Sequence, residues 1–304
     1  MIIKCRLLFT QVTTLLLTQS SCYRLKPNTI ASSFPTDIHF SQRFLTSPSP
    51  QKHISNLKQI HCFKMATMDS PSAERNKGPI WSVLSSYLLP KISESTSKQD
   101  DDQSSLQILE VAAGAGVHTL HFASSMLDAH KQPSQNAQQS PFQWYPTDPD
   151  NTSRSSIKER ILAAPPSIQS CISMPIDLTL DKDGGKFHDE TTREYAKLSQ
   201  QKLDLILCIN MIHISRWDAT LGLMKLATSR LKRGGVLYCY GPYKVNGTAT
   251  QSNLQFDMAL KARDSSWGVR NLEDVKLEAE ACGLRLDRTI EMPANNLSVI
   301  FVKK

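Results

Sequence analysis

The chain has 304 residues, and 40% of them are hydrophobic, which is enough for one large globular domain with a buried core. The formal net charge of +7 comes from one end: residues 1–64 hold eight Lys or Arg and one acid, and the rest of the chain holds 27 of each. The balanced body disfavours a nucleic-acid-binding protein, and no run approaches the roughly 20 apolar residues of a membrane-spanning helix. We therefore expect neither nucleic acid nor membrane as a partner.

Residues 1–69 are predicted to lie outside the fold, which we assign to residues 70–304. The first 64 residues are basic, rich in Ser and Thr, and poor in apolar periodicity. Three interpretations fit: an organelle transit peptide, a weak secretory signal, or a disordered extension ahead of an internal start at Met65 or Met68. We expect a cytoplasmic protein, and a mitochondrial or plastid protein if the segment is a real transit peptide.

Seven cysteines are spread along the chain without any Cys-x-x-Cys pair. This spacing predicts neither a zinc site nor a redox pair, and we expect no metal. Cys208 and Cys239 lie inside apolar runs, where cysteine behaves as a small hydrophobic residue. The pattern suits a reducing compartment.

Apolar runs and helical periodicity alternate along the body. The predicted strands cover residues 106–111, 142–150, 170–178, 203–210, 235–243, 284–292 and 296–304. The predicted helices lie within 70–90, where Gly78-Pro79 marks the start, and over 117–130, 155–164, 193–200, 215–231, 252–263 and 271–283. Polar stretches at 93–105, 131–141 and 181–192 are predicted loops or linkers.

Strands that alternate with helices predict parallel strands joined by right-handed crossovers. The last two strands are too close together for a crossover, so they are predicted to form a hairpin in which the final strand runs antiparallel. We therefore predict an α/β fold with a doubly wound, Rossmann-like sheet of seven strands.

The stretch ILEVAAGAGVH (108–118) predicts a ligand site after the first strand. Gly114 and Gly116 leave the backbone open to a ligand and permit positive φ, and the following helix offers free amides. The dinucleotide fingerprint needs a third glycine, where this chain has Thr119. Glu110 would repel a pyrophosphate but suits a cation. These features favour S-adenosylmethionine, with Glu110, Gly114 and Gly116 as cofactor-binding residues; the alternative is a tight strand–helix turn without a ligand.

Acidic residues after the next two strands extend this site. Asp148 is predicted to accept hydrogen bonds from both ribose hydroxyls, each contributing about 1.5–3 kcal/mol. The alternative is that Asp148-Pro149-Asp150 is only a turn and a helix cap. Asp177 would meet the adenine amino group, or is an ordinary turn residue.

Residues after the fourth and fifth strands are the catalytic candidates. Asn210 is predicted to bond to the cofactor or the backbone, and His213 to act as a base or to position the substrate, although simple packing is the alternative. Tyr243 and Asp257 are further candidates for accepting a proton. Arg75-Asn76-Lys77 is a candidate lid or a solvated turn, Tyr240 lies at the ligand edge, and Asn295-Asn296 is more typical of a turn.

Seven segments carry a resemblance to a known family: SAERNKGPI, LEVAAGAGVHTLHFA, WYPTDPD, CINMIHIS, LKRGGVLYCYGPY, SNLQFDMALKARDSSWGVRNLEDV and MPANNLSVIF. Together they resemble the methyltransferase-like 26 family, a domain of unknown function similar to class I S-adenosylmethionine-dependent methyltransferases. The resemblance covers about residues 70–304. It implies the seven-stranded methyltransferase fold, places Glu110, Gly114 and Gly116 in the first cofactor motif and Asp148 at the ribose, and assigns no methyl acceptor.

The sequence therefore predicts an enzyme that transfers a methyl group from S-adenosylmethionine to a small-molecule acceptor. The alternative is a non-catalytic protein that keeps the fold and the cofactor. A nucleotide-dependent oxidoreductase is opposed by the missing third glycine and by Glu110. The sequence makes no prediction of the oligomeric state.

Overall fold

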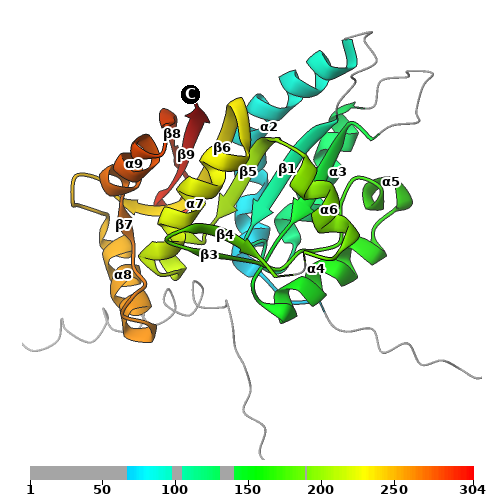
Figure 1. The fold of residues 1–304 in the computed structure, drawn as a ribbon. Helices are drawn as coiled ribbons and strands as arrows, with labels where there is room; N and C mark the ends of the chain where they lie inside the picture. The colour runs from blue at the N-terminus through cyan, green and yellow to red at the C-terminus, as the bar shows by residue number, and fades with distance from the viewer. Residues whose placement is uncertain (1–66, 98–104, 131–139, 189) are drawn as a thin grey trace, which may run out of the picture. The chain divides into compact units, whose positions relative to one another are not determined.

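The computed structural model describes residues 67–97, 105–130, 140–188 and 190–304 (Figure 1). The chain divides into two compact units, residues 1–64 and 65–304, and all described residues belong to the second. The predicted extension up to residue 66, residues 98–104 of the predicted linker at 93–105 and residues 131–139 of the predicted loop at 131–141 lie outside the described residues. Residues 93–97, also predicted as linker, are helical instead.

A seven-stranded sheet forms the centre of the described unit. Its strands are β1 (Leu106–Val111), β2 (Phe142–Pro146), β5 (Leu203–Ile209), β6 (Leu231–Lys244), β7 (Arg270–Asn271), β8 (Leu284–Met292) and β9 (Asn296–Lys303). The order is β2-β1-β5-β6-β9-β8, and the short β7 pairs with the end of β6. β1, β2, β5 and β6 are parallel, whereas β9 is antiparallel to β6 and forms a hairpin with β8. The predicted sheet class and its antiparallel last strand are confirmed.

The third predicted strand, 170–178, is the main departure from the predicted sheet. Apart from Leu178, which belongs to a separate two-stranded sheet, it makes two isolated parallel bridges to the β2 segment, Trp144 to Ile172 and Thr147 to Ile176. Pro175 stands between them and has no N–H to donate to a ladder, which explains the break. The count of seven is reached through β7 instead.

The predicted loop at 181–192 contains a strand. β3 (Leu178–Asp181) and β4 (Gly184–Phe187) form an antiparallel two-stranded sheet of their own. Asp181 Oδ1 accepts the Asp183 N–H at 2.8 Å inside the turn. The Asp183-Gly184 pair, a hairpin signal, was present in the sequence.

Helices cover both sides of the main sheet (Figure 1). They are α2 (Pro71–Ser97), α3 (Val117–His130), α4 (Asn151–Ala163), the short α5 (Pro166–Gln169), α6 (Arg193–Gln200), α7 (Trp217–Arg230), α8 (Gln251–Arg263) and α9 (Leu272–Ala281). Two 3-10 turns, η1 (Ile212–Ile214) and η2 (Pro293–Asn295), follow β5 and β8. Most predicted helices are found within a few residues of their expected bounds, and α5 was not expected.

Helix α2 begins well before the predicted start at Gly78-Pro79 and continues through Pro79 and Pro90. A proline inside a helix costs about 3 kcal/mol. The helix nevertheless buries a stripe of four-residue spacing, whose members Ile80, Leu84, Leu88 and Ile92 are each at most 2% exposed. Each such side chain contributes roughly 1.5–3 kcal/mol, so the buried face offsets the cost of the two prolines.

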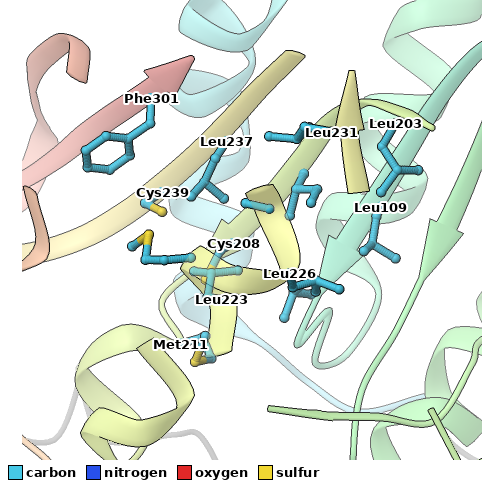
Figure 2. Packing of buried hydrophobic residues seen from close by; sticks show 14 of the residues in the cluster. Leu109, Leu203, Cys208, Met211, Leu223, Leu226, Leu231, Leu237, Cys239 and Phe301 are labelled. Atoms are coloured by element: carbon cyan, nitrogen blue, oxygen red, sulfur yellow. The ribbon is translucent and has the colours of Figure 1, made fainter. Parts of the chain in front are cut away.

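Each face of the sheet carries its own apolar core. On one face α7 and α9 pack against a cluster that includes Cys208, Leu223 and Leu237 (Figure 2). On the other, α2, α3 and α4 cover a cluster that includes Phe122 and Trp144. In β5, all seven residues are buried, as expected for a strand covered on both faces. Both faces are closed by these cores, so ligand chemistry is expected at the carboxyl edge.

No helix within the described part of the chain is long and apolar enough to cross a membrane.

Candidate functional site

The turn after β1 adopts an unusual backbone conformation. Ala112, Gly114 and Gly116 have φ values of 53°, 58° and 80°, all in the left-handed region that favours glycine. A Cβ on Gly116 would lie 3.1 Å from the Ile157 Cα in α4, whereas a Cβ on Gly114 would meet nothing within 4 Å. Gly116 therefore lets the turn pack on α4, and Gly114 leaves an open approach to the backbone.

Hydrogen bonds tie this turn to the end of β2. The Ala113 N–H donates to the Thr147 carbonyl at 2.8 Å, and the Gly114 N–H donates to Asp148 Oδ2 at 2.9 Å. The strained conformation is thus held by the neighbouring strand. The turn and Asp148, both predicted cofactor residues, form one hydrogen-bonded unit.

The Glu110 carboxylate lies behind the turn. It is 1% exposed, and its Oε2 accepts hydrogen bonds from Thr119 Oγ1 at 2.6 Å and Trp144 Nε1 at 2.9 Å. Burial raises the pKa of Glu110 to about 7, although both hydrogen bonds oppose the rise. The side chain is therefore bound to α3 and β2, and its predicted cofactor role stays a prediction.

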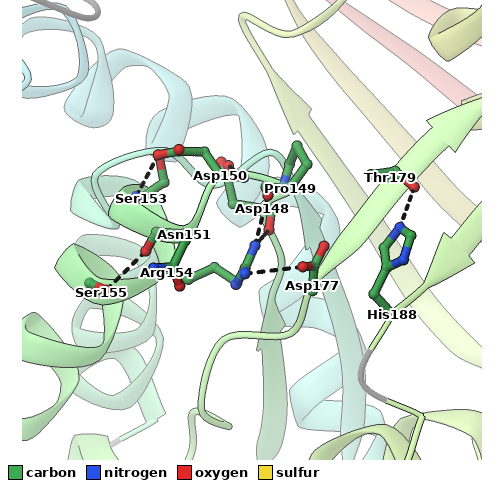
Figure 3. A network of polar contacts seen from close by, with 10 residues as sticks. All are labelled: Asp148, Pro149, Asp150, Asn151, Ser153, Arg154, Ser155, Asp177, Thr179 and His188. Carbon is green, nitrogen blue, oxygen red and sulfur yellow. Dashed lines mark hydrogen bonds and ion pairs between the residues drawn. The ribbon is translucent and has the colours of Figure 1, made fainter. Parts of the chain in front are cut away.

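The Asp148-Pro149-Asp150 segment separates two roles (Figure 3). Asp150 is the N-cap of α4 and accepts the Ser153 N–H at 2.8 Å. Asp148 is 3% exposed and accepts the Asp150 N–H at 2.9 Å through Oδ1. Burial raises the pKa of Asp148, opposed by its backbone hydrogen bonds and by Arg154. Asp150 is thus the helix cap, Asp148 Oδ1 makes the turn contact and Asp148 Oδ2 faces the glycine turn; the ribose role of Asp148 stays a prediction.

Asp177 joins the same network through Arg154. The Arg154 Nη2 lies 3.0 Å from Asp177 Oδ2, and Nη1 donates to the Asp148 carbonyl at 2.9 Å (Figure 3). Asp177 Oδ1 is buried and has no hydrogen-bond partner among the described residues. A buried acceptor without a donor is costly, and it suits a ligand N–H such as the predicted adenine amino group.

Asn210 and His213 follow β5. Asn210 has a φ of 59°, and its N–H donates to the Tyr240 carbonyl at 2.8 Å. A Cβ on Gly241 would lie 3.1 Å from His213 Nδ1 and 3.7 Å from Asn210 Oδ1, so both side chains converge on the end of β6. His213 is 5% exposed, and burial lowers its pKa to about 3. It is neutral at physiological pH and a weak base.

The other two predicted catalytic residues, Tyr243 and Asp257, are poorly placed to accept a proton. The Tyr243 hydroxyl is buried without a partner among the described residues, and burial raises its pKa well above the usual value. Asp257 is bound by Lys244 at 2.8 Å and by the Val269 N–H at 2.8 Å. These hydrogen bonds lower its pKa against the effect of burial. Among the described residues, no hydrogen bond or ion pair joins the side chains of His213, Tyr243 and Asp257, and their catalytic roles remain predictions.

Residues 67–303 match the family model described as "Protein of unknown function (DUF938)". The chain belongs to the DUF938 family.

Three solved structures are similar to this DUF938 protein. An O-methyltransferase family 2 protein from Planctomyces limnophilus, in complex with apigenin, is 16% identical at a TM-score of 0.50, covering 79% of this chain and 63% of that one. An O-methyltransferase family protein from Burkholderia thailandensis is 12% identical at 0.47, covering 77% and 61%. CalO1, a methyltransferase in calicheamicin biosynthesis solved with S-adenosylhomocysteine bound, is 13% identical at 0.46, covering 78% and 61%.

The first of these likenesses shows the class I methyltransferase-like fold and nothing finer. The DUF938 chain spans less than two thirds of the length of each of the three proteins.

Sequence reasoning missed a set of contacts made by the segment 67–70, which we call the strap. The Met68 N–H donates to Ser156 Oγ at 2.9 Å, and Arg160 Nη2 donates to the Met68 carbonyl at 2.8 Å. Arg160 Nε and Ser156 Oγ also donate to the Ala115 carbonyl, at 2.8 and 3.1 Å. These two α4 side chains join the strap to the glycine turn, and no local motif signals the pairing.

A second missed set of contacts involves Asn76, His118 and Tyr240. Asn76 Oδ1 in α2 lies 2.7 Å from His118 Nε2 in α3, so the imidazole donates from Nε2. Burial lowers the pKa of His118 to about 3. Asn76 and Asn296 also hydrogen-bond to the Tyr240 hydroxyl, which lowers its pKa against the larger effect of burial. Asn76 was a candidate lid residue, whereas His118 gave no signal beyond its place after the glycines.

Proposed function

We propose that this DUF938 protein is an S-adenosylmethionine-dependent methyltransferase acting on a small-molecule acceptor. One observation carries the proposal: the open, positive-φ turn at 112–116 is hydrogen-bonded to Asp148 at the carboxyl edge of a class I methyltransferase-like sheet. The absence of any atom within 4 Å of a Gly114 Cβ and the orphaned Asp177 Oδ1 support the fit of a nucleoside-bearing ligand.

Three groups would hold the cofactor. Asp148 would accept the ribose hydroxyls while keeping its bond to the Gly114 amide, and Asp177 Oδ1 would accept the adenine amino group. The first turn of α3 offers backbone amides to a carboxylate. When bound, S-adenosylmethionine supplies a methyl group on a sulfonium, which is already an activated leaving group.

The acceptor side would work chiefly by alignment, which can supply up to about 7–11 kcal/mol. His118 and His213 are neutral and weak as bases, and Asp257 is committed to Lys244 and Lys261. The acceptor would therefore bring a nucleophile that needs little help to lose its proton. Asn76, Tyr240 and His213 would position it beside the end of β6.

The same weakness of the bases favours a second candidate, a non-catalytic S-adenosylmethionine-binding or scaffold protein. Such a protein would keep the turn and Asp148 and show no turnover. Binding alone does not separate the two candidates, whereas methyl transfer does.

Calorimetric titration of the full chain with S-adenosylmethionine and with NAD tests the cofactor. We expect micromolar binding of the first and none of the second. Asp148→Asn should weaken binding by roughly tenfold or more, since it loses charge-assisted hydrogen bonds. Lys158→Ala, an exposed change on α4, is the matched control. NAD binding in place of S-adenosylmethionine would refute the proposal.

Incubation with labelled S-adenosylmethionine and fractionated cell extract tests the reaction. A small-molecule fraction that takes up label identifies the acceptor class. Cofactor binding without label in any fraction favours the scaffold candidate.

Two finer assignments belong to the same proposal. We place the chain with the methyltransferase-like 26 family on the motif string, and we place it in the cytoplasm, or in a mitochondrion or plastid if residues 1–64 act as a transit peptide. The four cysteines of the described residues are all free, which supports a reducing compartment. Fractionation of cells expressing the full chain tests the location.

A further inference from the structure

A second pocket lies away from the glycine turn, between the start of α7, the ends of β6 and β7, and the start of α9. It has a volume of about 390 Å³ and is lined by Trp217, Lys244, Arg270, Asn271, Asp274 and Glu278, with Val269 and Leu277. Small-molecule sites have volumes of roughly 300–1,000 Å³. None of the proposed cofactor-binding residues lines this pocket.

Arg270 brings a positive charge to the pocket that no acid of the described residues pairs with. Its Nη2 donates to the Ser215 and Ser266 carbonyls, each at 2.7 Å, and its guanidinium lies 5.8 Å from the centre of the Trp217 ring. Asp257, the acid whose field reaches Arg270, is already held by Lys244 and Lys261. Among the described residues Arg270 forms no ion pair. A half-buried cation held only by carbonyls attracts an anion.

The opposite charge lines the same pocket from α9. Asp274 Oδ2 accepts from Asn271 Nδ2 at 3.2 Å, and within the described ranges neither Asp274 nor Glu278 pairs with a cation. The Asn271 Oδ1 is buried and has no donor. Leu277 lies between Asp274 and Glu278 in the sequence, is 66% exposed, and contributes apolar surface to the pocket lining.

We propose that this pocket binds a small zwitterion of the α-amino-acid type with an apolar side chain. The carboxylate of the ligand would meet Arg270, its ammonium would meet Asp274 and Glu278, and its side chain would lie against Trp217 and Leu277. One ligand would then pair with the cation and with the two acids, which form no ion pair with one another among the described residues.

The pocket is connected to the loop that follows β5. Arg270 Nε donates to the Ile212 carbonyl at 3.4 Å and Nη2 to the Ser215 carbonyl, so the guanidinium spans the turn that carries His213. The Gly268 N–H donates to the His213 carbonyl at 3.0 Å. A carboxylate on Arg270 would therefore compete for the donors that fix this loop.

The ligand side of the proposal is tested by calorimetric titration of the full chain with three probes. L-leucine carries both charges, L-leucinamide lacks the carboxylate, and N-acetyl-L-leucine lacks the ammonium. We expect L-leucine to bind, and each of the other two to bind at least about tenfold more weakly than L-leucine. Equal binding of all three, or no binding of L-leucine at about 10 mM, overturns the proposal.

The protein side is tested with the two acids of α9, because Arg270→Lys would also disturb the loop. The double variant Asp274→Asn with Glu278→Gln should weaken L-leucine about tenfold and leave N-acetyl-L-leucine unchanged. Glu280→Gln makes the same chemical change on α9 outside the pocket and should leave L-leucine binding as it is. Unaltered binding in the double variant would count against the pocket even if L-leucine binds the protein.

Discussion

The tips of β1 and β2 and the tips of β5 and β6 build their parts of the carboxyl edge in different ways. At β1 and β2, backbone amides of Ala113 and Gly114 are bound to Thr147 and Asp148. At β5 and β6, side chains brought from α2, α8 and β9 surround Tyr240 and His213. Substitutions in the backbone-built part should therefore have large effects on stability, whereas single substitutions in the side-chain-built part should each cause a smaller loss of function.

The largest expected effect is that of Gly116→Val at the backbone-built side. Its Cβ would meet the Ile157 backbone at 3.1 Å and would force a branched residue to a φ of 80°. We expect a loss of roughly 2–5 kcal/mol in the free energy of unfolding, measured by urea denaturation. Gly114→Ala, whose Cβ has open space, should lose only about 1–2 kcal/mol, and equal losses would show that contact with α4 is unimportant.

The sequence signals were strong where a local pattern decides the structure. Continuous apolar runs predicted β1 and β5, and the two glycines predicted the turn. The β3–β4 hairpin was missed because the Asp-Gly signal lies in a polar stretch that also fits a loop. In α2, tertiary burial of its apolar stripe overrides Gly78 and Pro79.

In the candidate site too, residues in local patterns could be predicted, whereas long-range side-chain pairs could not. Asp148 follows directly from its place after a strand. The Asn76–His118 and Arg160–Met68 pairs join residues 42 and 92 positions apart, and no spacing in the chain indicates which long-range side chains meet.

The next effect in size concerns Glu110 and pH. Its folded pKa of about 7 exceeds the ordinary 4.5, so folding favours the protonated form. This contribution to stability is complete below pH 4.5 and is lost as the pH rises through 7. As the pH rises from 4.5 to 8, the free energy of unfolding of Glu110→Gln should therefore increase relative to that of the wild type by on the order of 3 kcal/mol. Parallel urea denaturations of both proteins cancel the other titrating groups; a constant difference would show that Glu110 does not titrate in this range.

Arg160→Ala should have an intermediate effect, because it removes donors from the Met68 and Ala115 carbonyls. We expect a loss of about 2 kcal/mol and faster proteolytic cleavage near the strap. Lys158→Ala on the same helix is the control. If Arg160→Ala lowers stability without faster cleavage at 67–70, the strap is held by other contacts.

The smallest effect is expected for His213→Ala, at the side-chain-built side. With a pKa of about 3 the imidazole stays neutral, so the pH profile of wild-type turnover should show no step near pH 6.5 from this residue. Turnover should fall about tenfold, less than the roughly 10²–10⁴ expected for a general base, with cofactor affinity retained. Unchanged turnover would limit His213 to packing, and a hundredfold loss would make it the base.

The break at Pro175 has a consequence for how copies of this protein meet. The segment 172–176 borders β2 at one margin of the sheet, and because it is broken into isolated bridges it offers an incoming strand no regular edge to pair with. At the other margin, β8 presents exposed Arg285 and Arg288. Two unrelated features, an interrupted edge segment and outward charge, thus oppose edge-to-edge aggregation of the sheet.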